Sequence, residues 1–316
     1  MAIYRFEAKI VSRSAGRSAT AAAAYRAATR LTDSRTGLAF NYSRKRGVLH
    51  TEILAPADAP DWMGDRSRLW NAVEIAEKRK DAQLARDLVL SLPHELTHEQ
   101  RVVLIREFAG EAFVARGMIA DVAIHAPDHR GDDRNHHAHV LLTMRSLMGQ
   151  GFGPKVRDWN ETSQLEAWRA GWAMAVNRHL ERAGCPARVD HRSLAGQGLT
   201  QEPEPKQGPV ATEMERDGCV SHAGEDRRAA KERNREREAL TDELQAINAE
   251  LEAESDAAPF EVPQKAARKI SRGAWSRYLY ELWQTVARGI TKPIAHLVKR
   301  AGREFGRRSV RNRRLE

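Results

Sequence analysis

The sequence predicts a mixed α+β fold in which strands alternate with amphipathic helices. Residues 3–11 alternate between apolar and polar side chains, the pattern of a strand with one buried face. Apolar side chains recur at helical spacing in residues 61–80, 97–116 and 159–183. The chain has 316 residues, of which 41% are apolar, so it can bury a core and wholesale disorder is excluded.

The N-terminal elements follow from local signals. The buried face of the first strand carries four side chains: Tyr4, Phe6, Ala8 and Ile10. A polar turn over residues 12–17 precedes Ser18, which is placed to cap a helix because the alanine-rich residues that follow it favour helix. Residues 48–54 predict a short strand, since two prolines come directly after them.

The middle of the chain predicts three helices and three further strands. The helix over 61–80 is expected to bury Trp62, Leu69, Trp70, Val73 and Ile75, and the helix over 97–116 to bury Val102, Val103, Ile105, Phe108 and Phe113. The third helix spans 159–183. Strands are predicted over 84–92, 118–125 and 137–145, with a polar loop between the last two.

The C-terminal third changes in composition. Residues 193–218 are rich in Gly, Pro, Gln and Glu, which indicates an extended segment. Residues 226–254 are dense in charge and carry leucines at helical spacing, so we expect a solvated helix or a short coiled coil. The last segment, 264–316, predicts a basic amphipathic helical tail.

The positive charge is concentrated in that tail. The formal net charge of the chain is +9, which favours a polyanionic partner such as nucleic acid or an acidic membrane surface. Residues 264–316 hold 15 Lys and Arg against 3 acidic residues, whereas the first 263 residues hold 37 against 40. The tail therefore reads as a binding arm, and its charge says nothing about chemistry elsewhere.

Two further counts restrict the class of protein. The chain has only two cysteines, Cys185 and Cys219, which excludes a disulfide framework or a Cys-based zinc site and indicates a reducing compartment. No run of about 18 apolar residues is present, and the N-terminus lacks the apolar core of a signal peptide. We therefore expect no transmembrane segment and a cytoplasmic location.

The region richest in chemistry is the histidine cluster over residues 125–139. Side chains two apart on a strand share a face, so His137 and His139 project together while His136 points away. His125, at the end of the neighbouring predicted strand, can reach the same face. Three imidazoles with open positions suit a catalytic metal such as zinc, manganese, nickel or iron. The competing interpretation is a set of polar, exposed histidines without a ligand.

A tyrosine is the candidate nucleophile, and the chain has five: Tyr4, Tyr25, Tyr42, Tyr278 and Tyr280. Tyr25 interrupts an alanine run between Arg13 and Arg26, and cationic neighbours favour a phenolate and hold a phosphate near it. Tyr42 stands beside Arg44, Lys45 and Arg46, which form a candidate phosphate-positioning loop. From the residues themselves, ordinary helix packing of Tyr25 remains open.

Three motifs in this order resemble the MobA/MobL family of conjugative relaxases, of the MOBQ type, within the HUH endonuclease superfamily. Residues 4–26 resemble the N-terminal motif that ends on the nucleophilic tyrosine. Residues 77–96 resemble the middle motif, and His125 with residues 135–140 resembles the histidine motif. One departure is His136, because the family often has proline at this position.

The resemblance implies a central antiparallel sheet flanked by helices and a divalent metal, Mg²⁺ or Mn²⁺, held by His125, His137 and His139. It implies that Tyr25 attacks a phosphodiester of single-stranded DNA, giving a 5′-phosphotyrosyl enzyme and a free 3′-hydroxyl. The chain would nick supercoiled plasmid DNA at an origin of transfer, stay attached, and rejoin the strand after transfer to a recipient cell. Accessory mobilisation proteins and a type IV secretion coupling protein are the implied partners, and no small-molecule cofactor is expected.

The general base is less defined by the sequence. Asp87 is the candidate for the base or for orienting a ligand histidine, with Asp121 and Asp128 as rivals and simple salt bridging as the alternative. Phosphate contacts are expected from Arg13, Arg26 and the cluster over residues 44–46. The predicted domains are a relaxase domain over 1–217, a charged helical linker or coiled coil over 218–263, and the tail over 264–316.

Three other functions are compatible with parts of this pattern. A rolling-circle replication initiator or a transposase of the same superfamily would place its tyrosine after the histidine pair, whereas Tyr25 precedes it. A non-catalytic DNA-binding mobilisation accessory protein would use the histidines structurally. A metal hydrolase would cut phosphodiesters without covalent attachment to DNA.

Overall fold

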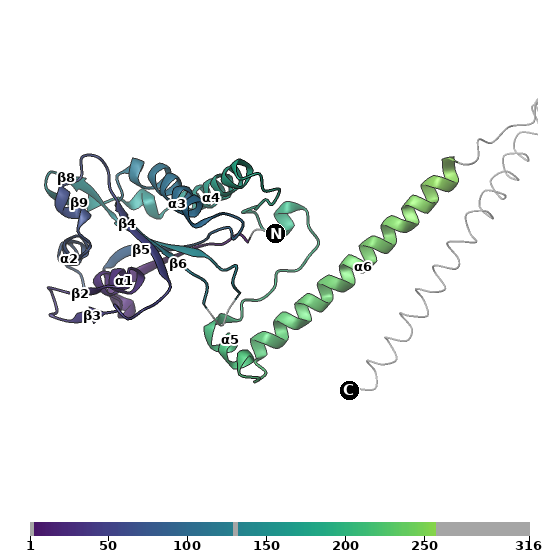
Figure 1. Ribbon diagram of the computed structural model, residues 1–316, viewed down its shortest axis with the longest axis horizontal. Helices are drawn as coiled ribbons and strands as arrows, with labels where there is room; N and C mark the ends of the chain where they lie inside the picture. The colour runs from purple at the N-terminus through teal and green to yellow at the C-terminus, as the bar shows by residue number, and fades with distance from the viewer. Residues whose placement is uncertain (1–2, 129–131, 257–316) are drawn as a thin grey trace, which may run out of the picture. The chain divides into compact units, whose positions relative to one another are not determined.

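A computed structural model describes residues 3–128 and 132–256 (Figure 1). Its contacts divide the chain into a first unit that ends at Ala230 and a second that begins at Lys231. The first unit holds a five-stranded antiparallel sheet in the order β1-β5-β7-β6-β4. Its strands are β1 (Phe6–Ser12), β4 (Val48–Leu54), β5 (Gln83–Ser91), β6 (Ala120–His125) and β7 (His137–Leu142).

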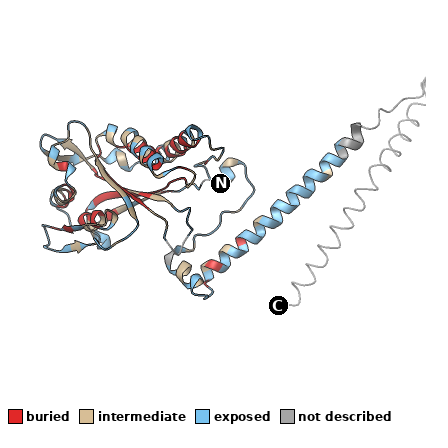
Figure 2. Ribbon diagram, viewed as in Figure 1, coloured by how far each residue is buried: buried red, intermediate tan, exposed pale blue. Residues whose placement is uncertain are grey.

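Helices cover both faces of the sheet (Figure 1). One core forms where α3 (His98–Ala112) and α4 (Thr162–Arg182) pack their aromatic side chains onto one face. A second core forms where α1 (Ala19–Arg26) and α2 (Arg66–Ala76) pack onto the opposite face. Figure 2 shows burial concentrated in the sheet and on the helix sides that meet it. The predicted α+β fold with a central antiparallel sheet and flanking helices is therefore confirmed.

Capping interactions define where the helices begin. The Ser18 side chain accepts a hydrogen bond from the Ala21 amide, as predicted, and so fixes the start of α1. Thr97 and Gln100 form a reciprocal capping box at the start of α3. Each such cap contributes about 1 kcal/mol. The cap of α1 also bears on the candidate nucleophile, because the helix carries Tyr25 near its other end.

Some predicted core positions are wrong. Residues 61–80 are not one helix: a 3₁₀ turn over residues 61–64 ends at Asp65, whose side chain caps α2. On α2 the predicted Leu69, Trp70 and Val73 are buried, as is Glu74. The neighbouring Ile75 is 63% exposed. Val103 of α3 is exposed as well. Burial of Val11 shows that both faces of β1 are covered at its end, where a bulge separates Val11 from Ser12.

Short elements were not predicted. Two hairpins are formed by β2 (Arg30–Thr32) with β3 (Ala39–Asn41) and by β8 (Arg145–Met148) with β9 (Gly151–Lys155). Single 3₁₀ turns lie at Arg13–Ala15, Asp61–Gly64, Val114–Arg116, Arg157–Asn160 and Ala195–Gln197. The segment 193–218, predicted to be extended, contains α5 (Gly208–Arg216). The prediction is wrong there because it rests on proline as a sign of extended chain, whereas the proline in the first turn of α5 is well tolerated at a helix start.

The charged segment is a helix, α6 (His222–Asp256), as predicted. It begins in the first unit and continues into the second. The basic tail predicted over 264–316 lies outside the described residues, and the domain boundaries at 217 and 263 remain predictions. No described helix is long and apolar enough to cross a membrane.

Candidate active site

The three predicted histidines lie together on one face of the sheet. His125 of β6 is paired in register with His137 of β7, and His139 lies two residues further along β7. Their ring centroids are 4.7–5.4 Å apart, and one nitrogen of each ring lies within 4.8 Å of the others. The alternation of side chains along a strand explains this arrangement, and it leaves His136 outside the group.

Hydrogen bonds orient two of the rings. Nε2 of His125 lies 2.7 Å from the carbonyl oxygen of Arg26, and Nδ1 of His137 lies 2.9 Å from the carbonyl oxygen of Asn135. A carbonyl only accepts, so these nitrogens carry the protons. In the neutral rings the other nitrogens, Nδ1 of His125 and Nε2 of His137, then keep free lone pairs.

Burial keeps the three rings neutral. It lowers the pKa of His125 to about 3, and it also lowers the pKa values of His137 and His139. A neutral imidazole with its second nitrogen held by a carbonyl is the form that binds a metal. The donor set therefore fits a divalent cation.

Tyr25 lies near the end of α1 and lines an open pocket of about 740 Å³ together with the three histidines. Its side chain is 46% exposed. The ring meets Tyr42 edge to face at 5.2 Å, and Nζ of Lys45 lies 3.6 Å from its centroid while donating to the Tyr25 carbonyl. The structure thus brings a tyrosine, a cation and three imidazoles into one pocket.

Lys45 is the cation that contacts the Tyr25 ring. Burial, followed by the charge of Arg26, lowers the pKa of Lys45 to about 8. Of the three basic residues over 44–46, Lys45 and Arg46 line the pocket. Arg44 is exposed and does not line it. The contact between Lys45 and the Tyr25 ring could not be found from the sequence, because the two residues are 20 positions apart and on different elements.

Asp87 connects the helix to the histidines. It is buried on β5, accepts two hydrogen bonds from the Arg26 guanidinium, and lies 3.9 Å from Nδ1 of His139. Burial raises the pKa of Asp87, but His139 and Arg26 outweigh it, so its pKa lies below the ordinary value. An ionised carboxylate already engaged by Arg26 is better suited to hold α1 in place beside His139 than to accept a proton.

The rival carboxylates have other partners. Asp121 accepts hydrogen bonds from Arg66 and from the indole of Trp70, which places it under α2 and outside the pocket. Asp128 borders the pocket and lies 3.5 Å from Arg216. Of the three candidates, only Asp87 contacts a histidine of the group.

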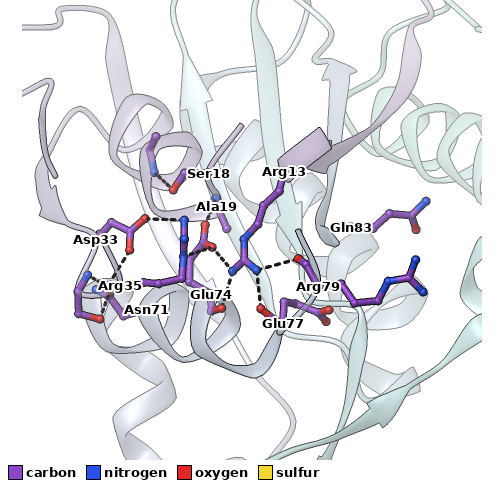
Figure 3. A network of polar contacts seen from close by, with 12 residues as sticks. Arg13, Ser18, Ala19, Asp33, Arg35, Asn71, Glu74, Glu77, Arg79 and Gln83 are labelled. Carbon is purple, nitrogen blue, oxygen red and sulfur yellow. Dashed lines mark hydrogen bonds and ion pairs between the residues drawn. The ribbon is translucent and has the colours of Figure 1, made fainter. Parts of the chain in front are cut away.

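Arg13 is not in the pocket. Its guanidinium, 11% exposed, donates to the Glu74 carboxylate and to the backbone carbonyls of Glu74, Glu77 and Arg79 (Figure 3). The Arg13 side chain is therefore used inside the fold, and its expected phosphate contact stays a prediction. Arg26 is likewise paired with Asp87, which leaves Lys45 and Arg46 as the pocket's cations.

Known proteins are similar to this chain in sequence. The model of the MobA/MobL family matches residues 17–217. Mobilization protein MobL of Acidithiobacillus ferridurans is 40% identical over 246 residues, which cover 68% of this chain and 64% of MobL. Conjugal transfer protein TraA of Rhizobium radiobacter is 38% identical over 247 residues, 68% of this chain and 22% of TraA. The chain thus spans less than two thirds of either relative.

A solved structure agrees with the fold. It was described under "Molecular Basis of Vancomycin Resistance Transfer in Staphylococcus aureus", is 37% identical, and superimposes with a TM-score of 0.57. The match covers 61% of this chain and all of that one. Since the family model spans well over half of the chain, including Tyr25 and the three histidines, the chain belongs to the MobA/MobL family.

Proposed function

We propose that the chain is a plasmid mobilisation relaxase that nicks one DNA strand at an origin of transfer by tyrosine transesterification. The observation that carries this proposal is that Tyr25, Lys45 and the histidine group line one pocket. The names of the relatives, mobilization and conjugal transfer proteins, support the same process. The chain then stays attached to the 5′ end and rejoins the strand after transfer.

The reaction exchanges one phosphodiester linkage for another. The phenolic oxygen of Tyr25 bonds to phosphorus, the bond from phosphorus to the 3′ oxygen breaks, and the phenolic proton leaves to solvent or a base while the 3′ oxygen gains one. Return of a 3′-hydroxyl reverses the exchange. Lys45 supplies positive charge over the ring of the attacking tyrosine, and exposure of Tyr25 lets a DNA strand reach it.

The histidine group would hold a divalent metal, Mg²⁺ or Mn²⁺ by the family resemblance. When bound, such a cation supplies positive charge that polarises the phosphate undergoing attack. His125 and His137 offer oriented lone pairs through their carbonyl contacts, and Asp87 lies 3.9 Å from Nδ1 of His139. Arg26 positions Tyr25, because the same residue pairs with Asp87 and contacts His125 through its carbonyl.

The partners follow from this function. The substrate is single-stranded DNA within supercoiled plasmid DNA at the origin, and accessory mobilisation proteins and a secretion coupling protein assist transfer. The protein acts in the bacterial cytoplasm and enters the recipient with the DNA. These statements rest on the proposed activity.

Incubating the chain with supercoiled plasmid carrying the origin, in the presence of Mg²⁺ or Mn²⁺, tests the function. We expect a nicked plasmid with protein attached to the 5′ end and a free 3′-hydroxyl. Nicking without attached protein would identify a metal hydrolase, and tight binding without nicking would identify an accessory protein. Adducts on a replication origin but not on a transfer origin would instead indicate a rolling-circle initiator.

DNA affinity is expected to depend on pH through Lys45. Its pKa of about 8 means that the side chain is a cation at pH 7 and becomes neutral as the pH rises through 8. Lys45→Gln should therefore weaken binding of a single-stranded oligonucleotide about five- to tenfold at pH 7 and little at pH 9. Fluorescence anisotropy measures this. Lys45→Arg is the control, because arginine keeps its charge at both pH values. If the DNA affinity of the wild type fell no more steeply between pH 7 and pH 9 than that of Lys45→Arg, the prediction would be contradicted.

The basic tail is proposed to add affinity without chemistry. Ending the chain after residue 263 removes 15 basic and 3 acidic residues. We expect weaker DNA binding and a flatter salt dependence, because fewer counterions are released, while a bound oligonucleotide is still cleaved. Loss of cleavage by a truncated chain with an unchanged circular dichroism spectrum would show that the tail belongs to the catalytic region.

A further inference from the structure

A second open pocket, of about 630 Å³, lies where α2 ends and β5 begins. Five basic side chains from separate segments line it: Lys78, Arg79, Arg145, Lys155 and Arg157. We call it the distal basic pocket. None of its lining residues lines the pocket of Tyr25, so the relaxase chemistry does not account for it.

The pocket is built around a buried acid. Glu77, 7% exposed, accepts from Nε of Arg145 at 2.7 Å and lies 3.1 Å from Nζ of Lys155. Lys155 also donates to the backbone carbonyl of Gln83 at 2.6 Å. Arg13 holds the backbone carbonyls of Glu77 and Arg79 from within the fold (Figure 3). Two cations are therefore fixed in place, which lowers the entropy lost when they bind an anion.

Positive charge remains after these pairings. The five basic side chains face two acidic ones, Glu77 and Asp81, and Asp81 pairs with Arg79. Lys78 and Arg157 are exposed and form no ion pair with any residue that the structure describes. An open, hydrophilic pocket with unneutralised lysine and arginine suits phosphate oxygens, which accept several charge-assisted hydrogen bonds.

Strand β5 connects this pocket to the active site. It begins at Gln83, whose carbonyl holds Lys155, and reaches Val89, which pairs with His139. Six residues of strand span about 20 Å. At the duplex rise of about 3.4 Å per base pair, that distance corresponds to about six base pairs, and an extended single strand covers it with fewer nucleotides. A DNA strand cut at Tyr25 can therefore reach the pocket only if it extends beyond the immediate cleavage site.

We propose that the distal basic pocket binds backbone phosphates of the DNA that flanks the cleaved phosphodiester, several nucleotides away from it. The proposal rests on the proposed function, since it takes the partner to be the DNA that Tyr25 cleaves. Phosphate contacts carry no sequence information, so this pocket adds affinity and fixes the path of the strand.

The test compares two double variants of the full chain. Lys78→Gln with Arg157→Gln removes the two unpaired cations and leaves the contacts of Glu77 intact. Arg30→Gln with Lys206→Gln is the control, because both residues are exposed and the charge change is the same. Each binds a short oligonucleotide with two nucleotides on either side of the cut, and oligonucleotides extended by 15 nucleotides on the 5′ side or on the 3′ side. The extensions are used single-stranded and as duplex.

We expect the pocket variant to bind at least one extended DNA about tenfold more weakly than the control variant does. Its plot of log affinity against log salt should lose about 1.4 in slope for a single strand and 1.8 for a duplex, the value for two phosphate contacts. Affinity for the short oligonucleotide and its rate of cleavage should not change. The extension that responds identifies the side and form of the bound DNA.

Equal affinities of the two variants for every extended DNA would overturn the proposal. An equal loss on short and extended DNA would overturn it too, since the pocket would then not be distal. Random-sequence oligonucleotides of the same lengths separate this proposal from the proposed function. A length-dependent defect with them supports the pocket even if no origin DNA is cleaved, because phosphate binding needs no particular sequence.

Discussion

Replacing Tyr25 with phenylalanine is expected to abolish covalent attachment to DNA and to lower cleavage roughly 10⁴-fold or more, the scale seen when a nucleophile is removed. The substitution deletes only the hydroxyl, so the ring keeps its edge-to-face contact with Tyr42 and its contact with Lys45. DNA affinity and thermal stability should therefore stay near those of the wild type. Denaturing gel electrophoresis of protein with end-labelled oligonucleotide measures the adduct directly.

Tyr42→Phe is the matched control. Its ring contacts the Tyr25 ring, and it stands beside the same cations, so it experiences the same surroundings without being placed at the end of α1. We expect this variant to form the adduct at close to the normal rate. If Tyr42→Phe lost the adduct and Tyr25→Phe kept it, the nucleophile would be Tyr42 and the assignment would be wrong.

The histidine group shows what sequence periodicity can predict. Residues two apart on a strand share a face whatever the rest of the fold does, so His137 and His139 could be placed together from their spacing. His125 needed one further assumption, that the strand before the loop is the antiparallel neighbour, and the register confirms it. The start of α1 at Ser18 was predictable for a similar reason, since capping is a local interaction.

The roles of charged residues were much harder to predict. Arg13 and Glu74 are 61 positions apart, and neither the loop of one nor the helix of the other indicates that they meet in the interior. The periodic pattern of α2 favoured Ile75 as the buried residue, because charged side chains ordinarily face solvent. The sequence predicts Asp87 as a general base or as a residue that orients a ligand histidine, but only the structure shows that Arg26 already engages its carboxylate. Such pairings depend on tertiary contacts and leave no local signal.

The second large effect is expected at Glu74, which is 0% exposed. Its carboxylate accepts from the amide of Ala19 at 2.7 Å and from Arg13 at 2.8 Å (Figure 3). The amide of Ala19 is one of the unpaired donors at the start of α1, where the helix dipole also favours a negative charge. Glu74→Ala leaves the Ala19 amide without its acceptor and the largely buried Arg13 guanidinium without its counter-charge, so we expect the free energy of unfolding to fall by about 3–5 kcal/mol.

Glu74→Gln separates the charge from the hydrogen bond. Glutamine keeps an oxygen for the Ala19 amide and fills the same volume, so the loss should be smaller, about 1–3 kcal/mol. Urea unfolding followed by tryptophan fluorescence reports on the first unit, because the neighbouring Trp70 is fully buried. Glu181→Gln, an exposed glutamate on α4, is the matched control and should change stability by less than about 0.5 kcal/mol.

The same variants test whether Glu74 positions Tyr25. Glu74 holds the first residue of α1, and Tyr25 lies six residues further along the same helix. A helix start that is less firmly held should lower the cleavage rate at saturating DNA more than it changes DNA affinity, because binding depends mainly on cations elsewhere. The double variant Arg13→Gln with Glu74→Gln removes the unpaired charge and should recover part of the stability. If Glu74→Gln were as stable as Glu181→Gln, burial of the ion pair would contribute nothing net, and the start of α1 would be held by Ser18 and packing instead.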